Sequence, residues 1–500
     1  MVFQSAQQAI GRMDSFLIPS IILNFMLRWL ISRFSYSGAR NPPLYGDYEA
    51  QRHWQEITYN LQPSEWYKNS TDNDLLYWGL DYPPLTAYHS WVNGFIGKSI
   101  NESWVRLHTS RGTQGYDHKI FMRSTVLISD VVIYFTGLIY YFMVVRKPLK
   151  PRERGMLATI GLMYPALILI DHGHFQYNCV SLGFTVWAVV MLMSGRYFLG
   201  SVFYCLALNY KQMSLYYSFS FFFFLLGICF QYPNRTKSMI TLATISSAVI
   251  MTFIACWFPF IWDSETFLSV VYRLFPISRG LYEDKVANIW CSLEVLIKLK
   301  RLVSASNMAK ISAITTLICL LPSSFHLFKN PTIKNFIYNM AGTSLIFFLL
   351  SFQVHEKTIL LAALPVTLLI HEHPFTTLWF YIISTFSLLP LMAKDGLIMP
   401  SLALTCFSLI IYVAFFRDMG LSVDFNLVHK ARTIIFVSSI CGCLFLTLAS
   451  TMLKPPSRYP HIYILLNSIY SCFHFIGFTF YYHYLQFYAE EPELFKVKGL

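Results

Sequence analysis

The chain has 500 residues, of which 55% are hydrophobic, 17% aromatic and only 13% charged. Soluble domains carry about 25% charged residues, and a soluble globule this apolar would expose patches that aggregate. A soluble enzyme, a disordered chain and a collagen-like chain are therefore excluded. The composition and the mean hydropathy of +0.47 predict a polytopic membrane protein.

The net charge is +12, from 38 Lys and Arg against 26 Asp and Glu. In a membrane protein such an excess reflects basic cytoplasmic loops. No basic run with interleaved aromatic residues lies outside an apolar segment, so nucleic-acid binding is not predicted. The ten cysteines lie in or beside apolar runs and form no CxxC or CxxH pair, which predicts neither a zinc site nor a disulfide framework.

Apolar stretches near the ~20 residues that a helix needs to cross the bilayer recur along the whole chain. They predict an all-α fold with about fourteen transmembrane helices. The predicted spans are 14–33, 123–145, 156–171, 177–194, 197–210, 213–230, 239–261, 308–328, 335–353, 358–372, 375–391, 397–416, 432–453 and 462–487. The first is predicted to stay as an anchor, because it carries Arg28 and lacks a small-residue cleavage site.

Two further runs, 85–98 and 290–305, are too short or too charged to cross the membrane comfortably. We expect them to be helices that lie in the membrane interface.

Basic residues set the expected orientation. They cluster at 146–154, flank the loop before the ninth span and precede the thirteenth span, and these three loops fall on one side by the count above. That side is predicted to be cytoplasmic, together with both termini. The loop 34–122, which is acidic for its length, then lies on the lumenal side and holds the sequons at Asn69 and Asn101.

The unusual polar clusters all fall on the lumenal side by the same count, although they were not used to assign it. Polar residues gathered at helix ends that face one compartment indicate a site at the membrane surface. The clusters are GDYEAQRHW (46–54), GLDYPPLTAYHS (79–90), DHGHFQYN (171–178), NYKQM (209–213), FPISRGLYEDKVANIW (275–290) and FQVHEK (352–357).

Each cluster also has a structural interpretation. Asp47 and Glu49 fit solvated loop carboxylates about as well as functional ones. The two prolines after Asp81 and Tyr82 fit a turn that holds the chain extended. Lys211 fits a lysine that snorkels to lipid headgroups, and the His355–Lys357 segment fits a structural ion pair.

His172 and His174 are two residues apart, so they do not share a helix face, and the sequence places no third ligand near them. A metal site is therefore not predicted. A polar cap on the third span is the simpler interpretation, and Gln176 and Asn178 could instead bind sugar hydroxyls.

Taken in order, these six blocks resemble the endoplasmic reticulum glucosyltransferases of asparagine-linked glycan assembly, over about residues 28–395. The likeness is stronger to members that add the first glucose to the nine-mannose lipid-linked oligosaccharide. Members that add the second glucose share the architecture but typically carry aromatic residues after the proline pair, where this chain has Leu85 to Ser90.

The resemblance implies the GT-C membrane fold, with residues 1–290 as a catalytic module and 291–500 as a second transmembrane module. It implies dolichyl phosphate glucose as the donor and dolichyl-diphosphate-linked oligosaccharide as the acceptor. It also implies the endoplasmic reticulum membrane as the location and inversion at the sugar carbon. It maps the catalytic base to Asp47. No metal or other cofactor is predicted, because cationic side chains can neutralise the charge of a dolichyl monophosphate.

A carboxylate base fits the chemistry, because a sugar hydroxyl is a weak nucleophile that must lose its proton as it attacks. The departing phosphate needs cationic or hydrogen-bonding partners rather than a general acid. The residues predicted to bind the substrates are Glu49, Arg52, Asp81, Tyr82, His172, His174, Gln176, Lys211, Gln212, Arg279, Asp284, Lys285, His355, Glu356 and Lys357.

Two other classes of function remain as alternatives. A transporter or flippase of lipid-linked sugars would carry charges near the bilayer midplane, where Asp130 is one of few found within a span. A non-catalytic scaffold subunit would leave the six polar blocks on one face without an explanation.

Overall fold

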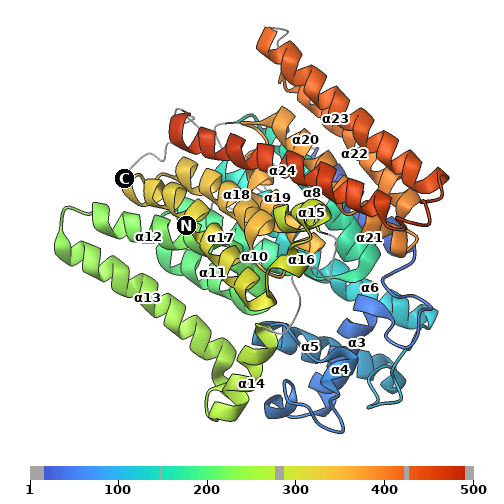
Figure 1. Ribbon diagram of the computed structural model, residues 1–500. Coiled ribbons are helices and arrows are strands. Elements are labelled where there is room, and N and C mark those ends of the chain that lie inside the picture. The colour runs from blue at the N-terminus through green and yellow to red at the C-terminus, as the bar shows by residue number, and fades with distance from the viewer. Residues whose placement is uncertain (1–15, 147–148, 276–285, 422–426, 490–500) are drawn as a thin grey trace.

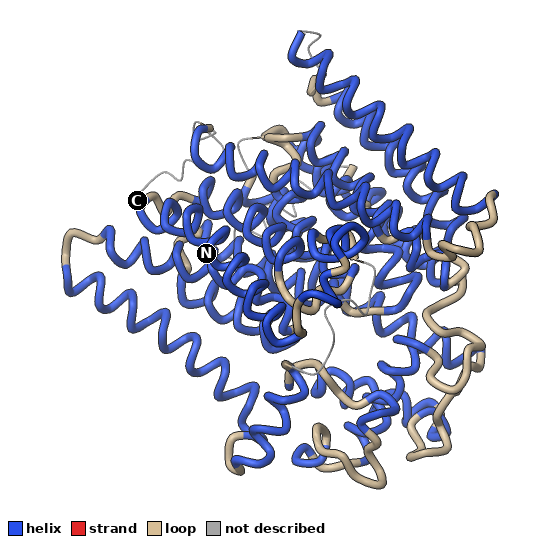
Figure 2. The backbone as a smooth tube through the Cα atoms, in the orientation of Figure 1, coloured by secondary structure: helices blue, strands red, loops and turns tan. Residues whose placement is uncertain are grey.

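The computed structural model describes residues 16–146, 149–275, 286–421 and 427–489. The described residues form helices joined by loops, with no strand among them, as Figure 2 shows. The all-α prediction is confirmed for this part of the chain. Long apolar helices satisfy their own backbone hydrogen bonds, which is the requirement for crossing a lipid bilayer.

The N-terminal region combines one apolar helix with a polar segment outside the bundle. Helix α2 (Leu17–Ser32) leads into α3 (Gly46–Asn60), α4 (Leu75–Trp78) and α5 (Pro84–Ile100). In Figure 1 the last three lie together at one end of the helical bundle. Their packing is built on a small aromatic core of its own, which includes Trp54, Trp66 and Phe260.

The remaining helices form the bundle and its flanks (Figure 1). In the first half of the chain they are α6 (Tyr116–Ser129), α7 (Thr136–Tyr140), α8 (Pro151–Leu162), α9 (Pro165–Ile168), α10 (Asn178–Met193), α11 (Tyr197–Tyr210), α12 (Ser218–Gln231), α13 (Arg235–Trp257) and α14 (Ser264–Leu274). In the second half they are α15 (Ile289–Ile297), α16 (Leu299–Leu302), α17 (Ala305–Lys329), α18 (Ile333–Leu350), α19 (Ile359–Leu368), α20 (Pro374–Ser387), α21 (Leu389–Lys394), α22 (Ile398–Asp418), α23 (Leu427–Met452) and α24 (Ile462–Tyr488).

The number of full-length spans is smaller than the sequence predicts. Among the described residues eight helices are long and apolar enough to cross a membrane, or nine if the bent pair Pro151–Leu162 and Pro165–Phe175 forms one span. The other five predicted spans correspond to helices of 10 to 16 residues, which are shorter than a straight crossing requires. These are α2, α10, α11, α19 and α20.

Prolines and π-helical turns account for part of this difference. Pro165 breaks the third predicted span into two segments that meet at 47°, because a proline cannot donate the backbone hydrogen bond that continues a helix. The second segment ends in the π-helix η5 (Leu169–Phe175), and the polar residues His172 and His174 lie in its last turn.

The two runs expected in the interface are helical but differ in form. Residues 85–98 lie within the single helix α5. Residues 290–305 are divided between α15 and α16 at Lys298, whose backbone is left-handed. The largest cluster of buried apolar residues has members on both sides of position 290. The packing therefore gives no boundary there, and the two-module division stays a prediction.

Candidate active site

The first turn of α3 carries Asp47, the residue predicted to be the base. The preceding Gly46 has φ of 69°, and a Cβ there would lie 2.6 Å from the Ser37 hydroxyl. Only glycine therefore allows the chain to turn this tightly into the helix. The Asp47 backbone N–H donates to Ser37 Oγ at 3.2 Å, and the helix N-terminus favours the negative charge of the carboxylate.

Three side chains from distant segments converge on one oxygen of Asp47. Lys357 Nζ and Gln176 Nε2 each donate to Oδ2 at 2.5 Å. His174 Nε2 lies 3.0 Å from the same atom. The predicted residues Asp47, His174, Gln176 and Lys357 thus form one contact group, which we call the Asp47 cluster.

Asp395, which the sequence analysis did not single out, extends this cluster. Its Oδ2 lies 2.5 Å from His174 Nδ1. The imidazole therefore has a carboxylate oxygen at each ring nitrogen, and it can donate to both only when it is protonated. Asp395 follows α21 in the C-terminal half of the chain, whereas Asp47 and His174 belong to the N-terminal half.

The cluster keeps Asp47 ionised. Burial acts to raise the pKa of the Asp47 carboxyl, but the charges and hydrogen bonds of Lys357 and His174 outweigh it and hold that pKa well below its usual value. The carboxylate retains 22% of its exposure, so it is a charged acceptor that a ligand can reach.

Asp47 opens onto a cavity of about 690 Å³, within the range of known ligand sites. The loop before α3, the segment His355–Lys357 and the segment after α20 form its walls, with Trp78 at one side. His174, His355, Glu356 and Lys357 line this cavity, as does Asp395. Five of the predicted site residues, Asp47 included, therefore line the same cavity.

A second set of predicted residues forms a contact group that does not line this cavity. Gln212 Nε2 donates to the Asp81 carbonyl at 2.9 Å, and Lys211 Nζ lies 5.0 Å from the centre of the Tyr82 ring. Lys211 Nζ also donates to Asn178 Oδ1 at 2.5 Å. This group connects the proline turn before α5 to the end of α11.

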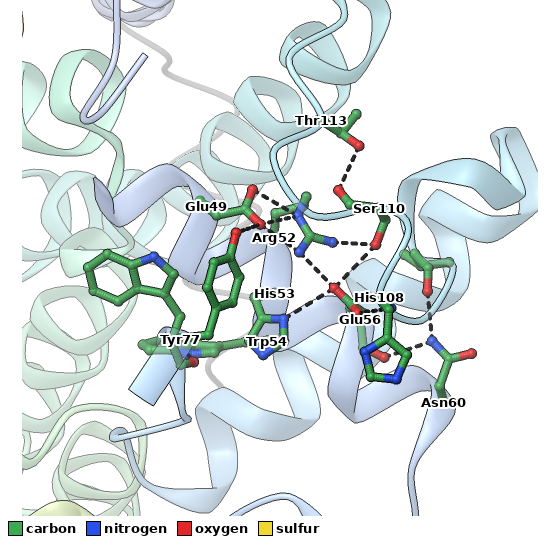
Figure 3. A network of polar contacts seen from close by, with 12 residues as sticks. Glu49, Arg52, His53, Trp54, Glu56, Asn60, Tyr77, His108, Ser110 and Thr113 are labelled. Carbon is green, nitrogen blue, oxygen red and sulfur yellow. Dashed lines mark hydrogen bonds and ion pairs between the residues drawn. The ribbon is translucent and has the colours of Figure 1, made fainter. Parts of the chain in front are cut away.

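Glu49 and Arg52 are buried in a third group, which we call the Arg52 network (Figure 3). Arg52 pairs with both Glu49 and Glu56 at 2.7 Å. Its Nη1 donates to Ser110 Oγ at 2.6 Å, and Tyr77 donates its hydroxyl to Glu49 at 2.8 Å. Neither Glu49 nor Arg52 lines the cavity, so this geometry favours a structural role for both.

His172 lies within the helical bundle rather than at the cavity. Its Nε2 is 2.8 Å from Asp130 Oδ2, which also pairs with Arg28 Nε at 2.5 Å. All three side chains are fully buried. The arrangement ties α2, the π-helix η3 (Asp130–Phe135) and η5 together, which is a structural use of charge within the bundle.

The other predicted residues, Arg279, Asp284 and Lys285, lie outside the described residues. Among the residues that the structure does describe, no group of three His, Cys, Asp or Glu side chains could hold a metal ion.

Comparisons with known proteins agree with these features. Residues 24–482 match the model of the ALG6, ALG8 glycosyltransferase family. The chain belongs to this family. It is 46% identical to the chicken protein named dolichyl pyrophosphate Man9GlcNAc2 alpha-1,3-glucosyltransferase, over 94% of this chain and 96% of that protein.

Other relatives carry the same designation. The rat protein of that name is 46% identical over 93% of this chain and 95% of its own length. A probable enzyme of the same name from Drosophila melanogaster is 43% identical over 93% of this chain and 97% of its own length. The resemblance that the six polar blocks indicate, and the enzyme class that it implies, are thereby confirmed.

Proposed function

We propose that this chain transfers glucose from dolichyl phosphate glucose to dolichyl-diphosphate-linked Man9GlcNAc2, forming an α-1,3 linkage during assembly of the N-glycan precursor. The acceptor and the linkage are those that the relatives' names give. The observation that carries the proposal from the site itself is the ionised Asp47 carboxylate at the wall of a ligand-sized cavity.

In the proposed reaction Asp47 accepts the proton of the attacking mannose hydroxyl. The hydroxyl oxygen forms a new bond to the sugar carbon while the bond from that carbon to the phosphate oxygen breaks. Attack from the face opposite the phosphate converts the β-linked donor into an α-linked product, so no covalent glucosyl-enzyme is needed. A positioned base of this kind typically contributes ~10²–10⁴-fold to the rate.

The leaving phosphate monoester carries its charge away without a general acid. Lys357 and His355 line the same cavity as Asp47 and can meet that charge directly. Lys357 is ion-paired with Asp47, and a phosphate that draws this ammonium toward itself would raise the pKa of Asp47. Binding of the donor would then make the carboxylate a better base. These side chains supply the positive charge, so we propose that no metal or other cofactor takes part.

We propose that His174 and Asp395 act as positioning residues. Asp395 fixes the orientation of the His174 ring through Nδ1, and Nε2 then holds the Asp47 carboxylate. Gln176 orients the same oxygen. The second Asp47 oxygen stays available for the acceptor hydroxyl.

We further propose that the helices adopt the GT-C arrangement in the endoplasmic reticulum membrane, with the cavity on the lumenal side and both termini in the cytoplasm. The coarser statement, a multi-pass membrane protein of this glycosyltransferase family, rests on the long apolar helices and on the family match. The short helices α2, α10, α11, α19 and α20 would complete the proposed set of spans if the bilayer thins locally and flanking residues snorkel to the headgroups.

A choice of acceptors tests the function. Purified protein would receive a synthetic dolichyl phosphate glucose analogue with either the unglucosylated or the monoglucosylated oligosaccharide lipid. We expect only the unglucosylated acceptor to be consumed. Consumption of the monoglucosylated acceptor alone would assign the second-glucose reaction instead. Lipid flipping in reconstituted vesicles without glucosyl transfer would favour the transporter alternative.

A further inference from the structure

A second and smaller cavity lies where the C-terminal end of α2 meets the N-terminal end of α6. It has a volume of about 30 Å³ and is lined by Arg33, Lys119 and Arg123, with Trp29 and Tyr116 at its edge. No acidic residue lines it, and it shares no lining residue with the cavity at Asp47. We call it the α2–α6 cleft.

The cations of the cleft are held in place by neutral groups. Arg33 Nη2 donates to the Tyr116 hydroxyl at 2.7 Å, and Lys119 Nζ donates to the Arg33 carbonyl at 3.0 Å. No acidic side chain lines the cleft with these two side chains and Arg123. Three positive charges therefore converge without a carboxylate in the cleft, and the charge of Asp395 acts on Arg123 from outside it.

Arg123 makes the cleft more than a surface patch. Its side chain is buried, with 2% of the residue exposed, and Nη2 donates to the carbonyls of Ser35 and Gly173 at 3.0 and 2.7 Å. Its Nε and Nη1 atoms are buried and have no hydrogen-bond partner. A buried guanidinium whose donors are not all satisfied is unfavourable, and an anion bound at the cleft would offset its charge.

The surface beside the cleft is apolar. Ile22, Met26 and Leu30 repeat every four residues along α2 and are about half exposed, and Ile128 follows on α6 with 62% exposure. Exposed apolar faces on helices of a membrane protein contact lipid chains. Aromatic and basic side chains gathered at the end of such a face are typical of the headgroup level.

We infer that the α2–α6 cleft binds the phosphate of an anionic glycerophospholipid whose acyl chains lie along the exposed face of α2. The cleft, with a volume of about 30 Å³, is too small for a sugar, so only the phosphate of a lipid would enter it. Neutral headgroups would leave the three positive charges uncompensated, which favours a lipid with net negative charge.

The bound lipid would also contact the catalytic region. Lys119 Nζ and the Arg123 guanidinium lie 5.8 and 5.9 Å from the centre of the Tyr36 ring. Tyr36 lines the Asp47 cavity and stacks on Tyr48 of α3, with the ring centres 4.0 Å apart. A lipid phosphate that fixes these cations would therefore brace one wall of the cavity.

The experiment measures lipid retention by the full chain in detergent, with phosphatidic acid, phosphatidylcholine and dolichyl phosphate as probes in native mass spectrometry. We expect phosphatidic acid to bind most tightly. The Arg33→Gln/Lys119→Gln variant should lose roughly 10- to 30-fold in affinity for phosphatidic acid, since each basic residue near a lipid surface strengthens the binding of anionic lipid. Arg123 is left unchanged because it also anchors the backbone.

The matched control is Lys98→Gln/Arg106→Gln, which removes two exposed charges from the same polar segment but away from the cleft. It should bind phosphatidic acid like the unmodified protein. Equal binding by the cleft variant, equal binding of phosphatidylcholine, or a preference for dolichyl phosphate would each overturn the inference. Unchanged melting temperatures for both double variants would exclude misfolding as the cause of any loss.

Discussion

The Asp47 cluster and the Arg52 network both include residues of α3 and use the same kinds of residue, yet they differ in their exposure to solvent. Each combines ionised carboxylate, a basic side chain and a histidine. In the Arg52 network Glu49, Arg52, His53 and Glu56 are at most 1% exposed. In the Asp47 cluster Asp47 and Lys357 keep 22% and 20% of their exposure and face a cavity.

This difference separates charge used for folding from charge available for chemistry. Arg52 donates hydrogen bonds to Glu49, Glu56 and Ser110. Glu56 accepts further hydrogen bonds from His53 and the His108 backbone. Because these side chains are buried, a ligand cannot reach them. Asp47 concentrates its protein contacts on one oxygen, which leaves the other able to accept a proton from a substrate.

Replacement of the base should produce the largest effect on turnover. We expect Asp47→Asn to lower the rate of glucosyl transfer by ~10²–10⁴-fold, because the amide cannot accept the hydroxyl proton. The melting temperature should change little, since the side chain is partly exposed and the backbone hydrogen bond to Ser37 remains. Steady-state rates and thermal unfolding of the purified variant provide the measurement.

The control for that variant is Asp72→Asn, which removes an exposed carboxylate from the same loop region and should leave the rate unchanged.

The dependence of the rate on pH further tests Asp47 as the base. Because Lys357 and His174 hold the pKa of Asp47 well below its usual value, the carboxylate stays ionised at neutral pH, and its protonation should not reduce the rate as the pH falls from 7 to 5. Normal turnover in Asp47→Asn would remove Asp47 as the base.

Removal of the Arg52 cation should lower the stability of the protein rather than its turnover number. Arg52→Met leaves the buried carboxylates Glu49 and Glu56 without their cation, and breaking a buried pair in this way typically costs about 3–5 kcal/mol. We expect a lower yield of folded protein and a lower melting temperature. The turnover number per folded molecule should stay close to that of the unmodified enzyme.

Active-site titration with a tight-binding donor analogue would count the folded molecules. Lys98→Met serves as the matched control, since it removes from α5 an exposed cation that donates to the Tyr59 hydroxyl. A stable Arg52→Met protein with a greatly reduced turnover number would instead place Arg52 in substrate binding, as the sequence analysis predicts.

Helical spacing explains why Asp47 and Glu49, which are close in the sequence and were both predicted to be site residues, belong to different groups in the structure. Asp47 and Glu49 are two residues apart and so point to different faces of α3. Glu49, Arg52 and Glu56 are spaced by three and four residues, which is the pattern of ion pairs along one helix face. That spacing was the available signal for a structural network, and it required knowing that 46–60 is a helix.

Contacts between site residues that are far apart in the chain were harder to predict from the sequence. Membrane-span parity brought Asp47, His174 and Lys357 to one side, and the structure brings them into contact. Asp395 gave no such signal, because a single carboxylate after an apolar run fits a solvated loop. The span count was too high for full-length helices because hydropathy does not register a bend such as the one at Pro165, nor an end such as Leu368 after ten residues.

The contribution of Asp395 is the smallest of these effects. Asp395→Asn keeps the shape of the side chain but removes the charge that faces His174 Nδ1. A hydrogen bond to a charged group contributes about 1.5–3 kcal/mol, so we expect kcat to fall roughly 10- to 100-fold. KM for donor and acceptor should change less, because the substrates would bind to residues other than Asp395.

A positioning role of Asp395 predicts a result that a purely structural role does not. Asp395→Glu retains the charge and should recover part of the lost kcat, while Asp395→Asn should leave the melting temperature nearly unchanged. Asp418→Asn, which removes an exposed carboxylate paired with Arg152, should behave as the unmodified enzyme. Asp395→Asn could instead lower the melting temperature and leave kcat per folded molecule intact. Asp395 would then be a stabilising charge, like the residues of the Arg52 network, and not a positioning residue of the Asp47 cluster.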